Sequence, residues 1–173
     1  MKNIVLIGMR GSGKTQIAKV LAQKLKKKFV DLDLELTKKA KQSIPEIVEQ
    51  HGWEHFRKLE AEIVKDFSPH SNLIIATGGG VVLDAKNIIN LRKNGTIVLL
   101  QARPEILAQR ILHSTERPSL TGQTITEELE VVWQERQEQY LSSADIIINV
   151  ELTTNNPHLD VEKKVQQILE QLK

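Results

Sequence analysis

Cysteine is absent from this chain of 173 residues, and aromatic side chains are scarce. Without cysteine the protein forms neither disulfide bonds nor thiolate metal sites. Aromatic residues make up 3% of the sequence and are not interleaved with the basic residues, so the stacking surface on which nucleic-acid binding depends is missing. The formal net charge of +2 is too small to attract nucleic acid to the surface as a whole. We therefore expect no nucleic-acid partner.

Long hydrophobic runs are also absent. None approaches the roughly 20 apolar residues of a membrane span, and the first apolar run begins at residue 3, so we expect neither a membrane segment nor a signal or transit peptide. Hydrophobic residues still make up 40% of the chain, enough for one core, and the 27% of charged residues suffice to solvate its surface. These proportions predict one compact cytoplasmic domain over residues 1–173.

The most informative feature that is present is a glycine-rich stretch with the sequence Gly8-Met9-Arg10-Gly11-Ser12-Gly13-Lys14-Thr15. It fills every fixed position of the phosphate-binding motif G-x-x-x-x-G-K-[ST], between an apolar run and a stretch with helical periodicity. Backbone N–H groups of such a loop, from Gly11 to Thr15, surround phosphate oxygens at the positive end of the following helix. We expect Lys14 to reach the β- and γ-phosphates and Thr15 to offer its hydroxyl to Mg²⁺. The motif predicts a nucleotide site but does not identify the reaction.

Short apolar runs alternate with longer amphipathic segments along the chain. The runs show almost no polar alternation, which is typical of parallel strands covered on both faces. This pattern predicts a single doubly wound α/β domain. The expected strands are 3–7, 29–32, 73–76, 96–100 and 145–148. The expected helices are 14–27, 34–41, 44–67, 84–94, 104–113, 125–143 and 159–172, with capping boxes at Ser43 and Thr124.

Two carboxylates follow the second expected strand, at the edge where ligands bind in a parallel sheet. These are Asp31 and Asp33. The third strand ends in Thr77 and three glycines, where an ordinary enzyme of this type carries the aspartate that holds Mg²⁺. We therefore expect Asp31 to act on the metal through a coordinated water and Asp33 to face an acceptor hydroxyl. The alternative is that both aspartates only cap the next helix.

The glycines Gly78, Gly79 and Gly80 are the second unusual feature at this edge. Three consecutive glycines carry a high conformational entropy cost on folding, which favours a place where the backbone approaches a ligand closely. A simple turn is the alternative.

Two arginines occupy helical positions that point to an anionic ligand. Arg136 lies on a stripe with Leu129, Val132, Trp133 and Tyr140, which should face the interior, and a buried guanidinium needs an anion. Arg57 and Glu60 are three residues apart, so the carboxylate can hold the guanidinium in position. Structural roles remain the alternative: Arg136 could snorkel, and Arg57 and Glu60 could form a surface pair.

A polar segment with proline and glycine, about 113–124, separates two expected helices and is interpreted as a mobile lid. Phosphoryl transfer must exclude water from the reacting groups, and a lid does so by closing over the nucleotide. Arg117 is the only arginine of this segment and could stabilise charge on the transferred group, unless it is an ordinary loop residue.

Together these residues resemble the shikimate kinase family, and the resemblance covers nearly the whole chain. The shared motifs are the phosphate-binding loop, D-x-D at Asp31 and Asp33, F-R-x-x-E from Phe56 to Glu60, the three glycines, R-P at Arg117 and E-R-x-x-x-Y from Glu135 to Tyr140. The resemblance implies a five-stranded parallel sheet in the order 2-3-1-4-5. It also implies transfer of the γ-phosphate of ATP to the 3-hydroxyl of shikimate by a Mg²⁺-dependent enzyme, which we expect to be a monomer.

The resemblance also implies roles for individual residues. Arg57 and Arg136 bind the shikimate carboxylate, Asp33 binds ring hydroxyls and accepts the attacking proton, and the backbone of Gly79 and Gly80 packs against the substrate. Lys14 and Arg117 neutralise charge on the phosphates, while Thr15 and Asp31 hold Mg²⁺. Arg110 stacks on adenine, with Asn156 and Pro157 near the opposite wall. The substrate-binding helical region is about 33–62.

Several positions depart from the family pattern. Gln16 stands where many relatives have a second hydroxyl residue, Ser119 replaces an aliphatic residue, and residues 150–156 contain no arginine. Another small-metabolite kinase, such as a gluconate kinase, also needs the phosphate loop and the lid, but two converging arginines have no purpose for a substrate recognised by its hydroxyls. A GTP-binding switch is the other alternative, and no N-K-x-D motif follows any strand.

Overall fold

A computed structural model of the chain describes residues 2–112, 124–151, 154 and 156–173. Arg117, Ser119 and all of the expected lid except Thr124 lie outside the described residues.

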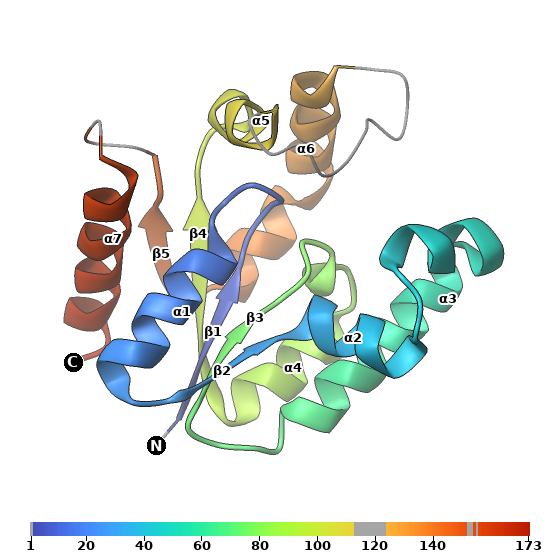
Figure 1. Ribbon diagram of the computed structural model, residues 1–173, viewed down its shortest axis with the longest axis horizontal. Coiled ribbons are helices and arrows are strands. Elements are labelled where there is room, and N and C mark those ends of the chain that lie inside the picture. The colour runs from blue at the N-terminus through green and yellow to red at the C-terminus, as the bar shows by residue number, and fades with distance from the viewer. Residues whose placement is uncertain (1, 113–123, 152–153, 155) are drawn as a thin grey trace.

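A parallel sheet of five strands forms the centre of the molecule (Figure 1). The strand order is β2-β3-β1-β4-β5, which confirms the order that the family resemblance implies. Strand β1 lies in the middle, with Ile4 opposite Ile74 of β3 on one side and Ile7 opposite Leu99 of β4 on the other. The strands are β1 Asn3–Ile7, β2 Lys28–Asp31, β3 Leu73–Ala76, β4 Gly95–Gln101 and β5 Ile146–Asn149.

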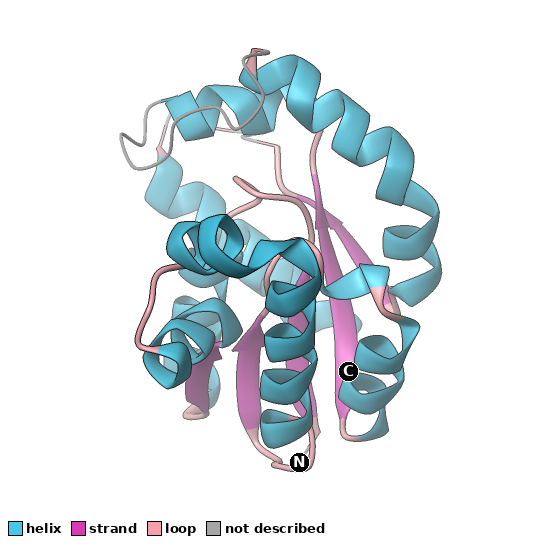
Figure 2. Cartoon of the chain, turned by 90° about the vertical axis from the view of Figure 1, so that its right-hand side faces the viewer, coloured by secondary structure: helices cyan, strands magenta, loops and turns pink. Residues whose placement is uncertain are grey.

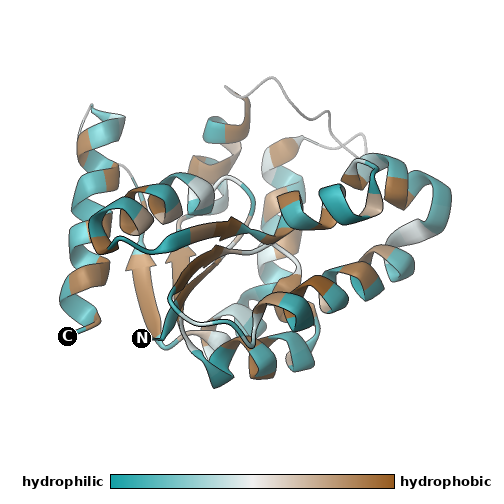
Figure 3. Cartoon of the chain, turned by 60° about the horizontal axis from the view of Figure 1, so that its bottom comes forward, coloured by the Kyte–Doolittle hydropathy of each residue, from teal (hydrophilic) through white to brown (hydrophobic). Residues whose placement is uncertain are grey.

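Helices lie on both sides of the strands (Figure 2), and most of them carry both polar and apolar residues, whereas the central strands are largely apolar (Figure 3). Helix α1 packs against α7 and β3, α3 packs against α2 and α4, and α5 packs against α6. The helices are α1 Lys14–Leu25, α2 Leu32–Ala40, α3 Ile44–Phe67, α4 Ala85–Lys93, α5 Pro104–Leu112, α6 Ile125–Ser143 and α7 Pro157–Gln171, with a 3₁₀ turn η1 at Val81–Leu83. Among the residues that the structure describes, no helix combines the length and the apolar character that crossing a membrane requires.

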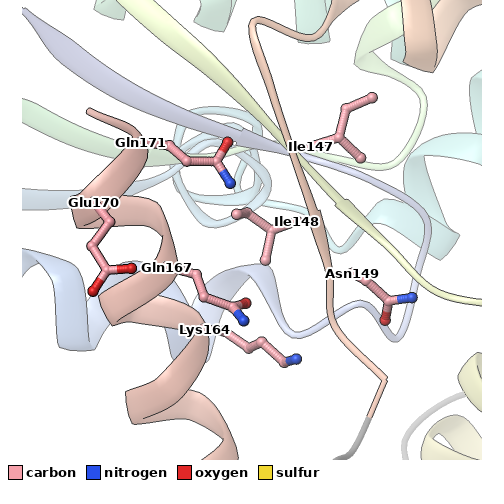
Figure 4. A pocket seen from close by; sticks show the side chains of 7 residues that line it. All are labelled: Ile147, Ile148, Asn149, Lys164, Gln167, Glu170 and Gln171. Atoms are coloured by element: carbon pink, nitrogen blue, oxygen red, sulfur yellow. The ribbon is translucent and has the colours of Figure 1, made fainter. Parts of the chain in front are cut away.

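The expectation that both faces of every strand are covered is correct for the central strands but wrong for the edge strand β5. Residues of β1 and β3 are all buried. In β5, by contrast, buried and exposed residues alternate: Ile148 points toward α7, whereas Ile147 points to the other side of the strand and is 45% exposed (Figure 4). An edge strand has one neighbouring strand and an incomplete helical cover, so the apolar run of β5 does not indicate burial on both faces.

Helix ends follow local side-chain chemistry. Ser43 and Thr124 form the expected capping boxes, in which each hydroxyl accepts an N–H bond and the glutamate three residues later bonds back. Helix α2 begins at Leu32, two residues earlier than expected, because Asp31 caps it and thereby places Asp33 in the first turn. Helix α3 is kinked at Gly52, whose φ of 80° leaves the helical region, a feature that the periodicity does not reveal.

Candidate active site

The phosphate-binding loop connects β1 to α1 in a conformation that depends on glycine. Gly8, Gly11 and Gly13 all have positive φ, and a Cβ at Gly8 would lie 2.5 Å from the carbonyl oxygen of Leu100. Gly13 caps α1, so the loop ends at the positive end of the helix. The predicted strand, loop and helix context of the motif is therefore present.

Lys14 lies across this loop. Its Nζ donates to the carbonyl oxygens of Gly8 at 2.8 Å and Met9 at 2.9 Å. Burial lowers the pKa of Lys14 from 10.5 to about 8, although the negative charges of Asp33 and Asp31 oppose this change. The loop carbonyls thus hold the ammonium in a place where phosphate oxygens can replace them. The negative charges of Asp33 and Asp31 are close enough to raise its pKa.

Asp31 performs two functions at the end of β2, because its two oxygens have different partners. Oδ1 accepts the backbone N–H groups of Asp33 and Leu34, at 3.2 and 3.3 Å, and so caps α2. Oδ2 accepts a hydrogen bond of 2.9 Å from the hydroxyl of Thr15. The capping role and the pairing with Thr15 that a metal site requires are therefore both present.

The end of β3 carries no carboxylate, as expected. Its next residue, Thr77, is buried, and its hydroxyl donates to the carbonyl of Leu6 at 3.1 Å, which ties β3 to β1. Within the described ranges no group of three or more His, Cys, Asp or Glu side chains could hold a metal ion. The oxygen donors near the loop are Thr15 and Asp31, a small set that fits Mg²⁺ because this ion keeps several waters and also binds nucleotide phosphates.

Two carboxylates flank the first of the three glycines. A Cβ at Gly78 would lie 2.6 Å from Oδ1 of Asp33 and 3.0 Å from Oε1 of Glu60. Glu60 is only 4% exposed, and burial raises its pKa while the neighbouring Arg57 opposes the increase. Its Oε2 accepts a 2.9 Å hydrogen bond from Arg57, whereas its Oε1 is buried and has no hydrogen-bond partner among the described residues. The pair of Arg57 and Glu60 is therefore not a surface pair, and the glutamate offers an unused acceptor.

Arg57 lies against the third glycine. A side chain at Gly80 would overlap the guanidinium, so glycine at this position makes room for the arginine. The guanidinium also lies 5.5 Å from the ring centre of Trp53 and 5.0 Å from that of Phe56. The aromatic rings, Glu60 and the backbone of Gly80 thus surround it.

The second glycine is held from the opposite side by α6. Tyr140 is completely buried, and its hydroxyl donates to the carbonyl oxygen of Gly79. Burial raises the pKa of Tyr140 to about 12, whereas the positive charges of Arg136 and Arg57 act in the opposite direction. The positive charge of Arg136 also lowers the pKa of Glu60. The two arginines therefore converge on one region, as predicted.

The expectation that Arg136 faces the interior is only partly correct. Leu129 and Tyr140 of the predicted stripe are buried, whereas Arg136, Val132 and Trp133 are partly exposed. Helix α6 packs mainly against α5 and the 3₁₀ turn η1 and has few contacts with the sheet, so the middle of its stripe is not covered by a continuous core.

A cavity of about 370 Å³ lies on the other side of the phosphate-binding loop. Its wall includes Gly11, Ser12 and Gly13, Gln16 and Ile17 of α1, Arg110 and Ile111 of α5, Val150, and the first turns of α7. Arg110 donates to the carbonyls of Gly11 and Val150, and burial lowers its pKa. Pro157 lines the cavity, and Asn156 beside it caps α7 by accepting two backbone N–H bonds.

Residues of this cavity also include some that the sequence analysis missed. Asp160 and Lys164 of α7 are almost completely buried and line the cavity with Pro157 and Val161. The four positions have the spacing i, i+3, i+4 and i+7, which places them on one helix face. The sequence signal that could have revealed them is the presence of two charged residues on the face of an amphipathic helix that should be buried.

Comparison with known proteins gives one consistent result. The family model for shikimate kinase matches residues 10–173. A curated protein named shikimate kinase 2, from Photorhabdus laumondii, is 41% identical over 153 residues, which is 87% of each chain. A curated shikimate kinase from Caldanaerobacter subterraneus is 45% identical over 150 residues, again 87% of each chain.

A solved structure agrees with the sequence comparison. The structure of shikimate kinase from Acinetobacter baumannii in complex with shikimate superposes with a TM-score of 0.89 at 30% sequence identity. The match covers 99% of this chain and 93% of the other, so it includes the sheet, the phosphate-binding loop and the helices on both sides.

Proposed function

The chain belongs to the shikimate kinase family, and we propose that it transfers the γ-phosphate of ATP to the 3-hydroxyl of shikimate. The products are shikimate 3-phosphate and ADP, in the pathway to chorismate and the aromatic amino acids. One observation carries the proposal: Asp33 lies between a donor site and an acceptor site. Its charge acts on Lys14 of the phosphate-binding loop, and its Oδ1 lies with Glu60 around Gly78, beside Arg57.

The donor site binds ATP. Backbone N–H groups from Gly11 to Thr15 surround the phosphates, and the ammonium of Lys14 leaves the carbonyls of its loop for the β- and γ-phosphate oxygens. Arg110, which lines the cavity beside the loop, stacks on adenine with Pro157 on the opposite wall. Arg117, outside the described residues, adds positive charge from the lid at about 113–124.

Thr15 and Asp31 are the residues that would hold Mg²⁺, Thr15 through its hydroxyl and Asp31 through a coordinated water. The hydroxyl of Thr15 donates a 2.9 Å hydrogen bond to Asp31, so the two oxygen atoms that would face the ion already lie next to each other. The ion would neutralise charge on the phosphates as the bond to the leaving ADP breaks.

The acceptor site binds shikimate in the helical region of about 33–62 together with α6. Arg57 and Arg136 bind the carboxylate, because a planar guanidinium offers paired donors that match its two oxygens. The backbone of Gly79 and Gly80 packs against the ring. Arg57 is kept in place by Glu60, and Gly79 by the hydroxyl of Tyr140.

Asp33 orients the hydroxyl that reacts. The 3-hydroxyl oxygen forms a bond to the γ-phosphorus, the bond from that phosphorus to the bridging oxygen of ADP breaks, and the hydroxyl proton passes to a carboxylate oxygen of Asp33. The protein contributes mainly position and electrostatic stabilisation, since both reactants are held by fixed groups.

Gluconate kinase and GTP-dependent switch activities fit these contacts less well. Gluconate also carries a carboxylate, but its open chain gives no reason for the backbone of Gly79 and Gly80 to pack against a ring. A switch needs no second cluster of charged groups such as Asp33, Glu60 and the two arginines beside the 78–80 glycines. We further propose that the enzyme acts as a cytoplasmic monomer without nucleic-acid or membrane partners.

The test is an assay of ADP release with shikimate, quinate and gluconate as separate acceptors. We expect turnover that depends on shikimate, little turnover with quinate or gluconate, and almost none with any acceptor in a Lys14→Ala variant. ATP hydrolysis that is unaffected by all three acceptors would instead support the switch, and turnover that depends on gluconate alone would support the other kinase.

A further inference from the structure

Tyr140 places a completely buried hydroxyl between α6 and the loop of three glycines. The hydroxyl donates a hydrogen bond to the carbonyl oxygen of Gly79. The ring is stacked on that of Trp133, with the ring centres 6.2 Å apart and the planes inclined by 18°. Both the ring and the hydroxyl of Tyr140 are therefore held in place, and the phenol oxygen still has lone pairs that can accept a hydrogen bond.

Arg136 supplies a donor to this oxygen. It lies one turn before Tyr140 on the same face of α6. Burial raises the pKa of Tyr140 to about 12, whereas Arg136 lowers it through its positive charge and through a hydrogen bond to the phenol oxygen. One hydroxyl thus donates to the backbone of the glycine loop and accepts from a guanidinium. Both of these groups belong to the proposed acceptor site.

The two arginines of that site are held in different ways. Arg57 forms a 2.9 Å ion pair with Glu60. Within the described ranges Arg136 forms no ion pair, and Glu60 acts on it through charge alone. Because a phenol with a pKa of about 12 is neutral at pH 7, Tyr140 orients the guanidinium of Arg136 without neutralising it. Arg136 therefore keeps its positive charge for an anionic ligand.

The bond to Gly79 also fixes the direction of a backbone donor. The C=O of Gly79 and the N–H of Gly80 belong to one trans peptide bond and point in opposite directions. With the C=O directed at Tyr140, the N–H of Gly80 points away from α6. Gly80 is buried, and a Cβ there would overlap the guanidinium of Arg57, so this N–H lies beside Arg57.

We propose that Tyr140 is a positioning residue of the acceptor site, whose hydroxyl holds Arg136 and the peptide between Gly79 and Gly80 so that both donors face the bound shikimate. Without the hydroxyl, the guanidinium of Arg136 loses an acceptor that restricts its rotation, and the C=O of Gly79 loses its partner. Neither donor is then oriented before the ligand arrives, and the ligand has to order both. The role rests on the proposed function, because it takes shikimate as the acceptor.

The first test is Tyr140→Phe, which removes the hydroxyl and keeps a ring that can stack on Trp133. We expect KM for shikimate to rise about tenfold or more, comparable to the loss of a hydrogen bond to a charged group, and KM for ATP to stay within about twofold. Calorimetric titration of shikimate without nucleotide should show the same loss of affinity. Unchanged affinity for shikimate, or equal losses for the two substrates, would overturn the proposal.

Asn3→Ala is the matched control for a loss of stability. Asn3 is buried at the amino end of β1, at the opposite edge of the sheet, where its side chain donates to the carbonyl of His70 at 2.8 Å and accepts the N–H of Leu73 at 2.9 Å. Both variants lose buried hydrogen bonds and should have a lower Tm, but Asn3→Ala should leave KM for shikimate unchanged. If Asn3→Ala raises this KM as much as Tyr140→Phe does, the effect follows from lower stability and the proposal is wrong.

A double variant tests the route through Arg136. In an Arg136→Ala background the hydroxyl has no guanidinium to hold, so Tyr140→Phe should lower kcat/KM for shikimate by a further threefold or less, on the order expected for coupled residues. A further loss as large as in the unchanged protein would show that the hydroxyl acts independently of Arg136, which would overturn the proposal. If the unchanged protein does not bind shikimate at all, the proposed function fails. If it binds shikimate and Tyr140→Phe binds it equally well, only the role of Tyr140 fails.

Discussion

Glu60 accepts a 2.9 Å hydrogen bond from Arg57 with one carboxylate oxygen, while its other oxygen is buried beside Gly78 without a partner in the part of the chain that the structure describes. The same side chain therefore fixes the arginine and presents an acceptor toward Asp33. A buried acceptor without a partner is costly, and such atoms occur where a ligand or water is bound. The relationship connects the packing of α3 to the proposed acceptor site.

Glu60→Gln should impair shikimate recognition while ATP recognition is retained. A neutral amide holds Arg57 more weakly than a carboxylate, since hydrogen bonds between charged groups are about twice as strong as neutral ones. We expect KM for shikimate to rise about tenfold, or about 1.4 kcal/mol, with KM for ATP within about twofold. Steady-state kinetics with each substrate varied in turn measures both values, and an equal rise in both would contradict the assigned role.

The same variant changes how stability depends on pH. Burial raises the pKa of Glu60 above its ordinary 4.5, so the folded protein binds this proton more tightly than the unfolded chain does. The stability that the protonated carboxyl of Glu60 contributes is therefore present at low pH. It is lost as the pH rises from 4.5 through the raised pKa of the folded protein. Relative to the unchanged protein, Glu60→Gln should gain stability between pH 4 and pH 7 in urea unfolding, and a difference that is independent of pH would contradict this.

Two substitutions of Asp31 should separate its contribution to stability from its contribution to catalysis. Asn also caps helices well, so Asp31→Asn should unfold within about 0.5 kcal/mol of the unchanged protein, whereas Asp31→Ala should lose about 1 kcal/mol. Both variants lose the charge beside Thr15, and we expect kcat to fall about 100-fold or more in each, with a higher Mg²⁺ requirement. Urea unfolding and a Mg²⁺ titration of the rate measure the two effects.

Asp84→Ala is the matched control for that comparison. Asp84 caps α4 in the same way, by accepting the N–H of Lys86 at 2.9 Å. Its loss should cost similar stability and leave kcat nearly unchanged. If Asp31→Asn also retains its activity, Asp31 is a helix cap and not a metal ligand.

Gly80→Ala should affect activity more than stability, because the added methyl overlaps a flexible side chain and not the backbone. We expect Arg57 to move, kcat/KM for shikimate to fall about 100-fold, and the free energy of unfolding to change by about 1 kcal/mol or less. The double variant Gly80→Ala/Arg57→Ala should then be no worse than Arg57→Ala alone. Additive losses would show that the methyl acts on the substrate directly and not through Arg57.

Lys14 should take up a proton when ATP binds. Its pKa is lowered to about 8 by burial, so near pH 9 most of the free enzyme has a neutral Lys14, and the phosphates of ATP restore the charge. At pH 9 we expect uptake of about one proton per ATP, and at pH 6.5 almost none from this group. Calorimetry in buffers of different ionisation enthalpy measures the uptake, and Lys14→Met should abolish it. Persistence of the uptake in that variant would assign the proton to another group.

The sheet and several contacts of the two proposed ligand sites were accessible from sequence because each depends on local patterns. The apolar runs predicted all five strands, and the spacing of Arg57 and Glu60 predicted their 2.9 Å hydrogen bond. The position of Asp31 after β2 predicted its approach to Thr15 and left a helix cap as the alternative, and the structure shows both contacts.

Other features depend on contacts between elements that are distant in sequence. The bond from Tyr140 to the carbonyl of Gly79 and the absence of a partner for Oε1 of Glu60 follow from how α6 and α3 pack on the 78–80 loop. Exposure of Ile147 follows from the edge position of β5, which its apolar run does not indicate. Lys164 was missed because a lysine in an amphipathic helix is usually solvated, and only the assembled cavity shows that it is buried.

The most direct test of the central claim identifies the product. After incubation of the enzyme with ATP, Mg²⁺ and shikimate, phosphorus NMR should show one new phosphate monoester coupled to the proton on C3 of the ring, formed in a 1:1 ratio with ADP. ADP that forms without a phosphorylated acceptor, or a phosphate coupled to another ring position, would contradict the assignment of Asp33, Arg57 and Arg136 to a site for the 3-hydroxyl of shikimate.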